Sequence, residues 1–175
     1  KLDMGDMGVA SFASESGLTG ISAYDDKMPT AGEEVWDDMD GQANGIATIE
    51  DAGTLGYTNS FGMFGVSLSY NPDAGATTSE SSQSIVLTAA PADGVSVFLG
   101  IGDKAGASPS GNSTDLQTLG GTYATGPITV GLQATRMDSP TAAADVDRNA
   151  AAISFAVNEN MSVSYGMSTV EFEAA

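Results

Sequence analysis

Seven carboxylates lie close together between residues 25 and 40, and Lys27 is the only basic side chain among them. They are Asp25, Asp26, Glu33, Glu34, Asp37, Asp38 and Asp40. Such a cluster could create a field that attracts cations, ligate Ca²⁺, or supply an acid and a nucleophile for glycoside hydrolysis. Neighbouring loop acids are usually just solvated, and the chain has no histidine or cysteine for a Ser-His or Cys-His mechanism. We therefore expect no enzyme.

The residues around the cluster predict a long loop. Pro29, Gly32, Gly41 and Gly45 interrupt any long helix or strand. We expect residues 1–5 to be a strand end and residues 6–52 to be an acidic loop folded inward against a wall of strands. In that position the seven carboxylates would line a constriction. The alternative, in which they lie on an exposed part of the loop and are merely solvated, stays open.

Calcium is the metal that this cluster could hold. Asp37, Asp38 and Asp40 are the candidate ligands, and no cofactor is otherwise expected. Asp40 to Asp51 partly matches an EF-hand loop, but no flanking helices are apparent. A less regular calcium site in the loop is therefore the better form of this hypothesis.

The composition excludes several partners. The formal charge is -18, which argues against nucleic acid and against docking on an anionic membrane surface. The sequence contains no run of roughly 18 apolar residues, so it predicts no transmembrane helix. Charged residues make up 16% of the chain, and twelve of the 23 acids lie in residues 1–52. The remaining chain is thus unusually poor in charge for a soluble domain.

After residue 52 the sequence alternates with period two, as in Phe64, Val66, Leu68 and Tyr70 with small or polar residues between them. This pattern predicts eight strands over residues 53–175, joined as hairpins. Short turns alternate with longer polar loops at 72–80, 103–113 and 139–147. Phe98 is a bulky residue on an otherwise small face. Gly120-Gly121 interrupts the pattern and could mark a bulge or bend.

The position of the charges separates two kinds of β-protein. Every charged residue beyond residue 52 falls in a predicted loop, turn or strand end. One strand face is apolar and the other carries Ser, Thr, Gly and Ala. A lipid-facing surface explains this, because a charge at mid-membrane costs about 2–4 kcal/mol and a closed barrel leaves no unpaired strand edge. We predict an all-β, transmembrane, antiparallel β-barrel in the single domain 1–175.

Three segments carry a resemblance to a known family. KLDMGD resembles the strand end that leads into a constriction loop, GTLGYTNSFGMFGVSLSY resembles the hairpin that follows, and QATRMDSPTAAADVDRNAAAISFAV resembles a later strand–loop–strand unit. Together they are similar to general porins of the Rhodobacter-type, alphaproteobacterial family. The resemblance covers most of the chain.

The resemblance implies a 16-stranded, homotrimeric barrel in the bacterial outer membrane, of which this chain would be about half. It implies passive diffusion of small hydrophilic solutes and ions through a water-filled channel. We expect the carboxylates of the acidic loop to make that channel favour cations. Outer-membrane lipid and lipopolysaccharide would be its surroundings. The alternatives are a small eight-stranded outer-membrane barrel and a soluble secreted β-protein of calcium-binding or adhesin-like type.

Overall fold

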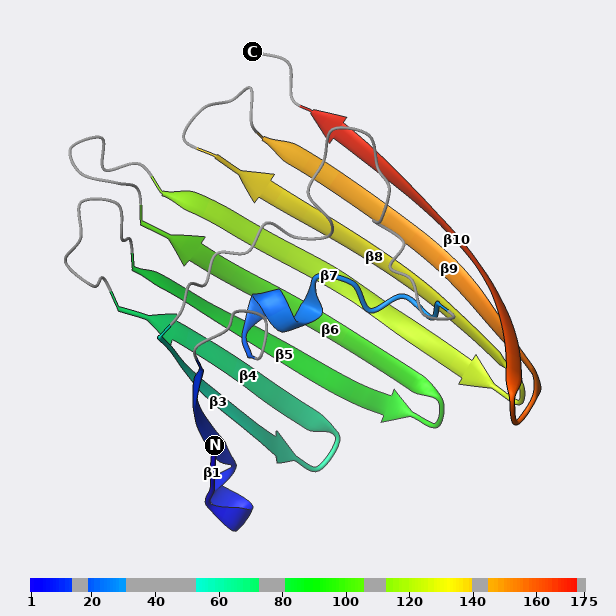
Figure 1. The fold of residues 1–175 in the computed structure, drawn as a ribbon, viewed down its shortest axis with the longest axis horizontal. Helices are drawn as coiled ribbons and strands as arrows, with labels where there is room; N and C mark the ends of the chain where they lie inside the picture. Colours follow the sequence, from blue (N-terminus) through cyan, green and yellow to red (C-terminus); the bar gives the residue numbers. More distant parts are fainter. Residues whose placement is uncertain (14–18, 31–52, 73–80, 106–112, 140–144, 173–175) are drawn as a thin grey trace.

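The computed structural model describes residues 1–13, 19–30, 53–72, 81–105, 113–139 and 145–172. These residues form one antiparallel sheet in which every strand pairs with its neighbours in the sequence (Figure 1). The strands are β1 (Leu2–Asp3), β2 (Val9–Ala13), β3 (Thr54–Phe61), β4 (Phe64–Asn71), β5 (Ser82–Ala92), β6 (Val95–Lys104), β7 (Thr114–Thr125), β8 (Ile128–Asp138), β9 (Val146–Asn158) and β10 (Met161–Phe172). The all-β prediction is confirmed, and the sheet is open rather than closed.

Helical structure is sparse. The described residues contain two short 3-10 helices, η1 (Gly5–Met7) and η2 (Ile21–Tyr24), and no α-helix. Within that part of the chain, no helix has the length and apolar character needed to cross a membrane.

Two-residue turns join the strands at one end of the sheet. Gly62, Gly94 and Gly126 each occupy such a turn with positive φ, at 60°, 72° and 56°. Glycine adopts this conformation without a steric penalty, and it matches the twist of a tight hairpin. The β4–β5, β6–β7 and β8–β9 connections lie at the opposite end and are longer. We call the two ends the turn end and the loop end.

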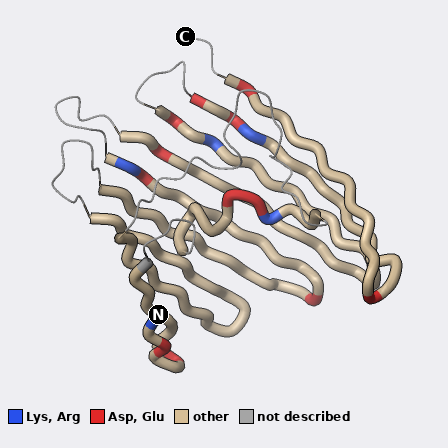
Figure 2. The backbone as a smooth tube through the Cα atoms, viewed as in Figure 1, with Lys and Arg blue, Asp and Glu red and all other residues tan. Residues whose placement is uncertain are grey.

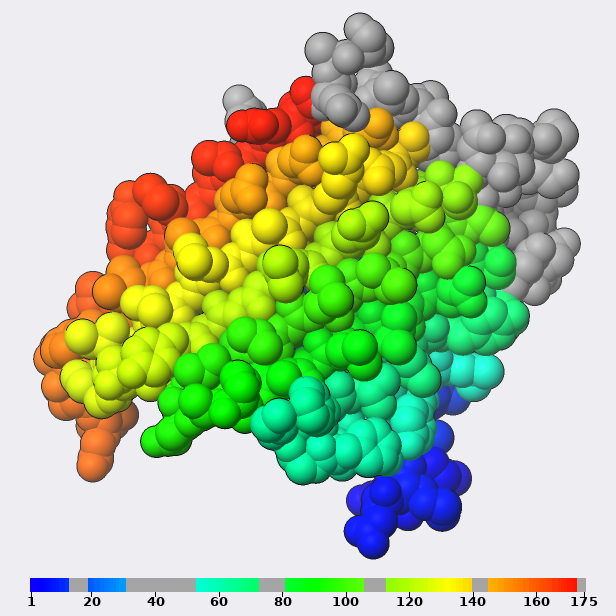
Figure 3. Space-filling view, turned by 180° about the vertical axis from the view of Figure 1, so that it is seen from behind, coloured from blue at the N-terminus to red at the C-terminus, as the bar shows by residue number. Residues whose placement is uncertain are grey.

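The two faces of the sheet differ in chemistry. One face carries exposed apolar side chains such as Leu87, Leu99, Leu119 and Leu132, which are 52–68% exposed. This open face is seen in Figure 3, where no described segment crosses the strands. The opposite face carries buried small polar residues such as Ser67, Ser84 and Thr118. Residues 19–30 lie against it, and we call it the covered face.

The charges follow the predicted distribution among the described residues. In strands β3 to β10 and their turns, the charged residues lie at the turns or within a few residues of the loop end, which leaves the middle of these strands uncharged (Figure 2). Asp93 and Glu159 lie at the turn end, whereas Asp103, Asp115 and Glu171 lie near the loop end.

Two sequence expectations need correction. The segment predicted as loop from residue 6 contains strand β2, which pairs with β3 from Val9↔Thr58 to Ala13↔Thr54. This strand is too short for its alternation to stand out from the loop composition around it. Gly120-Gly121 marks no bulge, because the register of β7 with β6 and β8 is continuous through both glycines. Gly120 instead leaves room for the ring of Phe98, which a Cβ at that position would meet.

Candidate functional site

Residues 19–30 run across the covered face, and η2 contacts strands β4 to β7 (Figure 1). Serine hydroxyls of the sheet hold the start of this crossing segment. The backbone N–H of Gly20 donates to Ser67 Oγ at 2.8 Å, and that of Ile21 donates to Ser84 Oγ at 2.8 Å. Ser69 and Ser84 also share a hydrogen bond at 2.6 Å. Small hydroxyl side chains therefore bind a backbone that approaches the sheet closely.

A small apolar cluster fixes the middle of the crossing segment. Ile21 is fully buried against Val86, Phe98 and Leu116. Tyr24 packs on Phe98, with ring centroids 5.3 Å apart. Burying one such aliphatic side chain stabilises a fold by roughly 1.5–3 kcal/mol. Phe98, which stood out in the sequence as bulky for its face, therefore helps to hold the segment.

Glycines in the sheet make room for the segment along its path. A Cβ on Gly56 would collide with the side chain of Thr19, and one on Gly100 would lie 3.3 Å from Ile21 Cγ1. A Cβ on Gly131 would lie 2.6 Å from Pro29 Cδ. Beside that position, Met28 is buried with Ala150 and Ala152 of β9. The segment thus follows a track of glycines from β3 to β8, which lets it approach the sheet at these three points.

Gln133 of β8 contacts the segment with both ends of its amide. Its Nε2 donates to the backbone oxygens of Tyr24 and Asp25, at 2.8 and 3.0 Å. Its Oε1 accepts a hydrogen bond from the backbone N–H of Lys27 at 3.0 Å. The side chain is 3% exposed, and its Nε2 also lies 3.2 Å from Thr118 Oγ1.

Asp25 and Asp26 are the two predicted constriction residues that lie among the described residues. Asp25 Oδ1 accepts from the N–H of Asp26 at 2.8 Å, and Asp26 Oδ1 accepts from the N–H of Met28 at 2.6 Å. Both carboxylates therefore stabilise the local turn of the segment. Burial raises the pKa of Asp25, against the lowering effects of its backbone hydrogen bond and of Lys27. Glu33, Glu34, Asp37, Asp38 and Asp40 lie outside the described residues.

Basic groups on the covered face were missed in the sequence. Lys104 and Arg148 are the basic residues of the described strands that share this face, since Lys104 pairs with Ser82 and Arg148 with Thr135. Arg148 is 4% exposed. Lys27 adds a third cation, with Nζ 5.0 Å from the ring centroid of Tyr24. The sequence did indicate the face of Arg148, because this residue is in phase with Ala150 and Ala152 in the alternation of β9.

The described residues contain no group of three or more acidic, histidine or cysteine side chains placed to hold a metal ion. Asp37, Asp38 and Asp40, the candidate calcium ligands, are not among them. The calcium hypothesis stays a prediction from the sequence.

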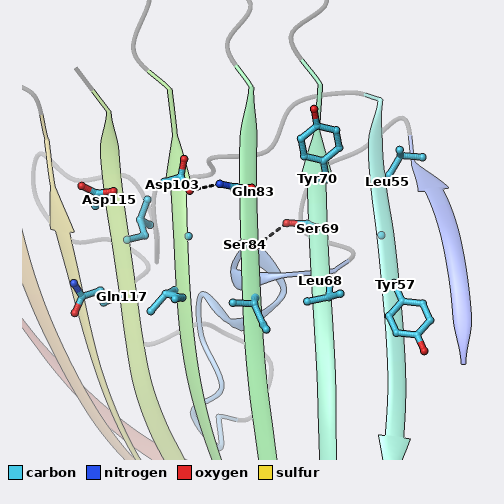
Figure 4. Close-up of a pocket in the computed structure, with 15 residues that line it drawn as sticks. Leu55, Tyr57, Leu68, Ser69, Tyr70, Gln83, Ser84, Asp103, Asp115 and Gln117 are labelled. Atoms are coloured by element: carbon cyan, nitrogen blue, oxygen red, sulfur yellow. Dashed lines mark hydrogen bonds between the residues drawn. The ribbon is translucent and has the colours of Figure 1, made fainter. Parts of the chain in front are cut away.

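The open face has a hollow of about 720 Å³ between β3 and β7, near the loop end (Figure 4). Leu55, Leu68 and Tyr70 contribute apolar walls. Gln83 and Asp103 lie along its polar side and share a hydrogen bond of 3.0 Å. The hollow therefore lies where the apolar surface of the sheet gives way to charged side chains.

Comparison with known proteins decides the family. A family model described as Gram-negative porin matches residues 1–174. The chain belongs to the Gram-negative porins. No curated protein matched the chain. Porins lie in the outer membrane of Gram-negative bacteria as β-barrels, and they are channels rather than enzymes. The apolar open face and the uncharged middle of this porin's sheet agree with that setting.

Proposed function

We propose that the covered face of this porin lines a water-filled channel for passive diffusion of small hydrophilic solutes and ions. The observation that carries the proposal is the crossing segment, which spans the hydroxyl-bearing face from Ser67 of β4 to Gln133 of β8. A segment held across the inside of a barrel wall narrows the path that a solute can take. The open face would then meet lipid, as its exposed leucines require.

We further propose that the acidic loop makes the channel favour cations. Glu33, Glu34, Asp37, Asp38 and Asp40 follow the crossing segment directly in the sequence. Carboxylates in a narrow, partly desolvated passage raise the local concentration of cations. Lys104 and Arg148 on the covered face act in the opposite direction, so the preference reflects the balance between loop and wall.

The larger assembly is part of the same proposal. Strands β3 to β10 contain 8 to 13 residues each, which suits tilted membrane crossings. The resemblance to Rhodobacter-type porins supports a 16-stranded barrel, with this chain as about half of it, and a homotrimer. Charged side chains near the loop end of the open face, such as Asp103, Asp115 and Asp138, would lie at the level of the lipopolysaccharide head groups.

The first experiment is the reversal potential of the purified full-length porin in a planar bilayer under a KCl gradient. We expect stepwise conductance and a potential that favours K⁺. Replacing Glu33, Glu34, Asp37, Asp38 and Asp40 together with the matching amides should reduce that preference, because the field of the loop is removed. The control replaces Asp103 and Asp115 on the open face with asparagine, which should leave the potential unchanged.

The possible outcomes test separate parts of the proposal. Conductance without cation preference would retain the channel and remove the acidic loop from its ion path. An equal change in the loop and control variants would show a general surface-charge effect. Absence of conductance in a protein that stays soluble without detergent would overturn the channel.

A further inference from the structure

We propose that Gln133 is the positioning residue that holds the crossing segment at one place on the channel wall, and so sets the steady open conductance. The inference rests on the proposed channel function. It starts from the three contacts of this one side chain to the backbone of residues 24, 25 and 27. These contacts lie beyond those of Gly20 and Ile21, whose backbone N–H groups donate to Ser67 and Ser84.

The chemistry of these contacts explains why an amide stands here. The oxygens of Tyr24 and Asp25 need donors, whereas the N–H of Lys27 needs an acceptor. Glutamine supplies two donor hydrogens and an acceptor in one planar group. Because Gln133 is almost fully buried, removing it would leave backbone groups unsatisfied in a site that excludes most water.

The surroundings orient the side chain. Thr118 on the neighbouring strand lies 3.2 Å from Nε2 and shares a hydrogen bond of 3.2 Å with Thr135. Gly131, on the same face of β8, leaves the space that Met28 and Pro29 occupy. The amide is thus held by the wall on one side and binds the segment on the other.

The position of these bonds links them to conduction. The chain passes from Lys27 through Met28 and Pro29, and the acidic stretch begins at Glu33. The contacts of Gln133 to residues 24, 25 and 27 therefore lie a few residues before that stretch. A segment fixed here keeps residues 24–27 at the same place on the channel wall in every molecule. A released segment would sample several positions, each with its own conductance.

Single-channel recording of Gln133→Met tests the inference. Methionine has a similar length but cannot form these hydrogen bonds. We expect transitions to other conductance levels to occupy roughly tenfold more of the open time than in the wild type, as the loss of several buried hydrogen bonds implies. The matched control is Gln117→Met, which makes the same change on the open face of β7, where the side chain is exposed. This control should behave as the wild type.

A second variant provides a readout that general destabilisation would not give. In Gln133→Glu the ionised carboxylate cannot donate to Tyr24 or Asp25, but the protonated acid can donate one hydrogen bond. The excess transitions should therefore decrease as the pH is lowered, measured against the wild type at each pH. If Gln133→Met fails to fold, this pH dependence decides the question.

The outcomes separate the inference from the proposed function. No conductance in the wild type would overturn the channel itself. Steady wild-type channels, with Gln133→Met indistinguishable from Gln117→Met, would overturn the role of Gln133 alone. Excess transitions in Gln133→Glu that do not change with pH would also overturn it.

Discussion

At the residue scale, two carboxylates of the crossing segment can act both as hydrogen-bond acceptors for the backbone and as sources of a field. Asp25 and Asp26 cap backbone N–H groups within the segment, although the sequence suggested only that they contribute to a field. One carboxylate can serve both purposes when one oxygen binds the backbone and the other faces water. The described geometry supports the capping role directly, and their place in the ion path stays a prediction.

Asp25 gives a pH-dependent stability that can be measured. Its pKa is raised by burial, so the protonated form is favoured by folding. Its contribution to stability is present below the usual carboxyl pKa of about 4 and is lost as the pH rises through the folded value. Asp25→Asn should therefore stabilise the protein at neutral pH, by less than about 1 kcal/mol because the side chain is only partly buried and stays in contact with water.

The measurement for Asp25→Asn is heat unfolding in detergent, followed by tyrosine fluorescence at several pH values. The unfolding temperature of the variant should exceed that of the wild type near pH 7, and the difference between the two temperatures should shrink toward pH 3. Asp103→Asn on the open face is the control, since its carboxyl lies away from the segment. A difference that grows on acidification would contradict the assignment of burial as the dominant effect.

At the scale of elements, the strands of the sheet and a loop folded against them were predicted from the sequence, but the path of the crossing segment and its contacts were not. Alternation of apolar and small residues identified the eight strands because each buries one type of side chain per face. The path of residues 19–30 depends instead on Ser67, Phe98 and Gln133, which come from separate strands far along the chain. Their convergence follows from register, which no local pattern contains. Strand β2 was read as loop for a different reason, because its five residues are too few for an alternation to stand out. Arg148 could have been placed from the sequence, since it is in phase with the alternation of β9.

A substitution at Gly131 tests whether the crossing segment needs the space that the glycines of the sheet leave for it. In Gly131→Val the added side chain would overlap Pro29 and Met28, where a Cβ would already lie 2.6 Å from Pro29 Cδ. Overpacking of this kind typically costs about 1–3 kcal/mol. We expect urea unfolding of the reconstituted porin to show this decrease in the free energy of unfolding. We also expect the single-channel currents of the variant to be unsteady.

Ala134→Val is the control for Gly131→Val. Ala134 lies on the same strand, but it is exposed on the open face. It should unfold as the wild type does. An equal loss in both variants would mean that valine disturbs strand β8 itself rather than the seating of the segment.

At the scale of the whole molecule, the uncharged middle of the sheet determines where the protein can reside. Leu132 is 68% exposed on the open face, away from both charged ends. Leu132→Arg should destabilise the membrane-inserted protein by about 2–4 kcal/mol, because a charge at mid-membrane must be brought out of water. Urea unfolding from lipid vesicles measures this loss.

Gln117→Arg is the matched variant for Leu132→Arg. It adds the same side chain to the same face at the level of Asp115 and Arg136, where the expected cost is about 0–1 kcal/mol. Similar losses at both positions would contradict a lipid-facing middle band.

The contacts of the crossing segment also impose an order on folding. The strands pair with their sequence neighbours, so each hairpin can form as a local event. Gln133, however, follows Lys27 by 106 residues. The entropy of closing so long a loop is recovered only after strand β8 is in place. The hairpins must therefore assemble before the segment can take its place against the covered face, and its contacts are completed after the strands that provide them.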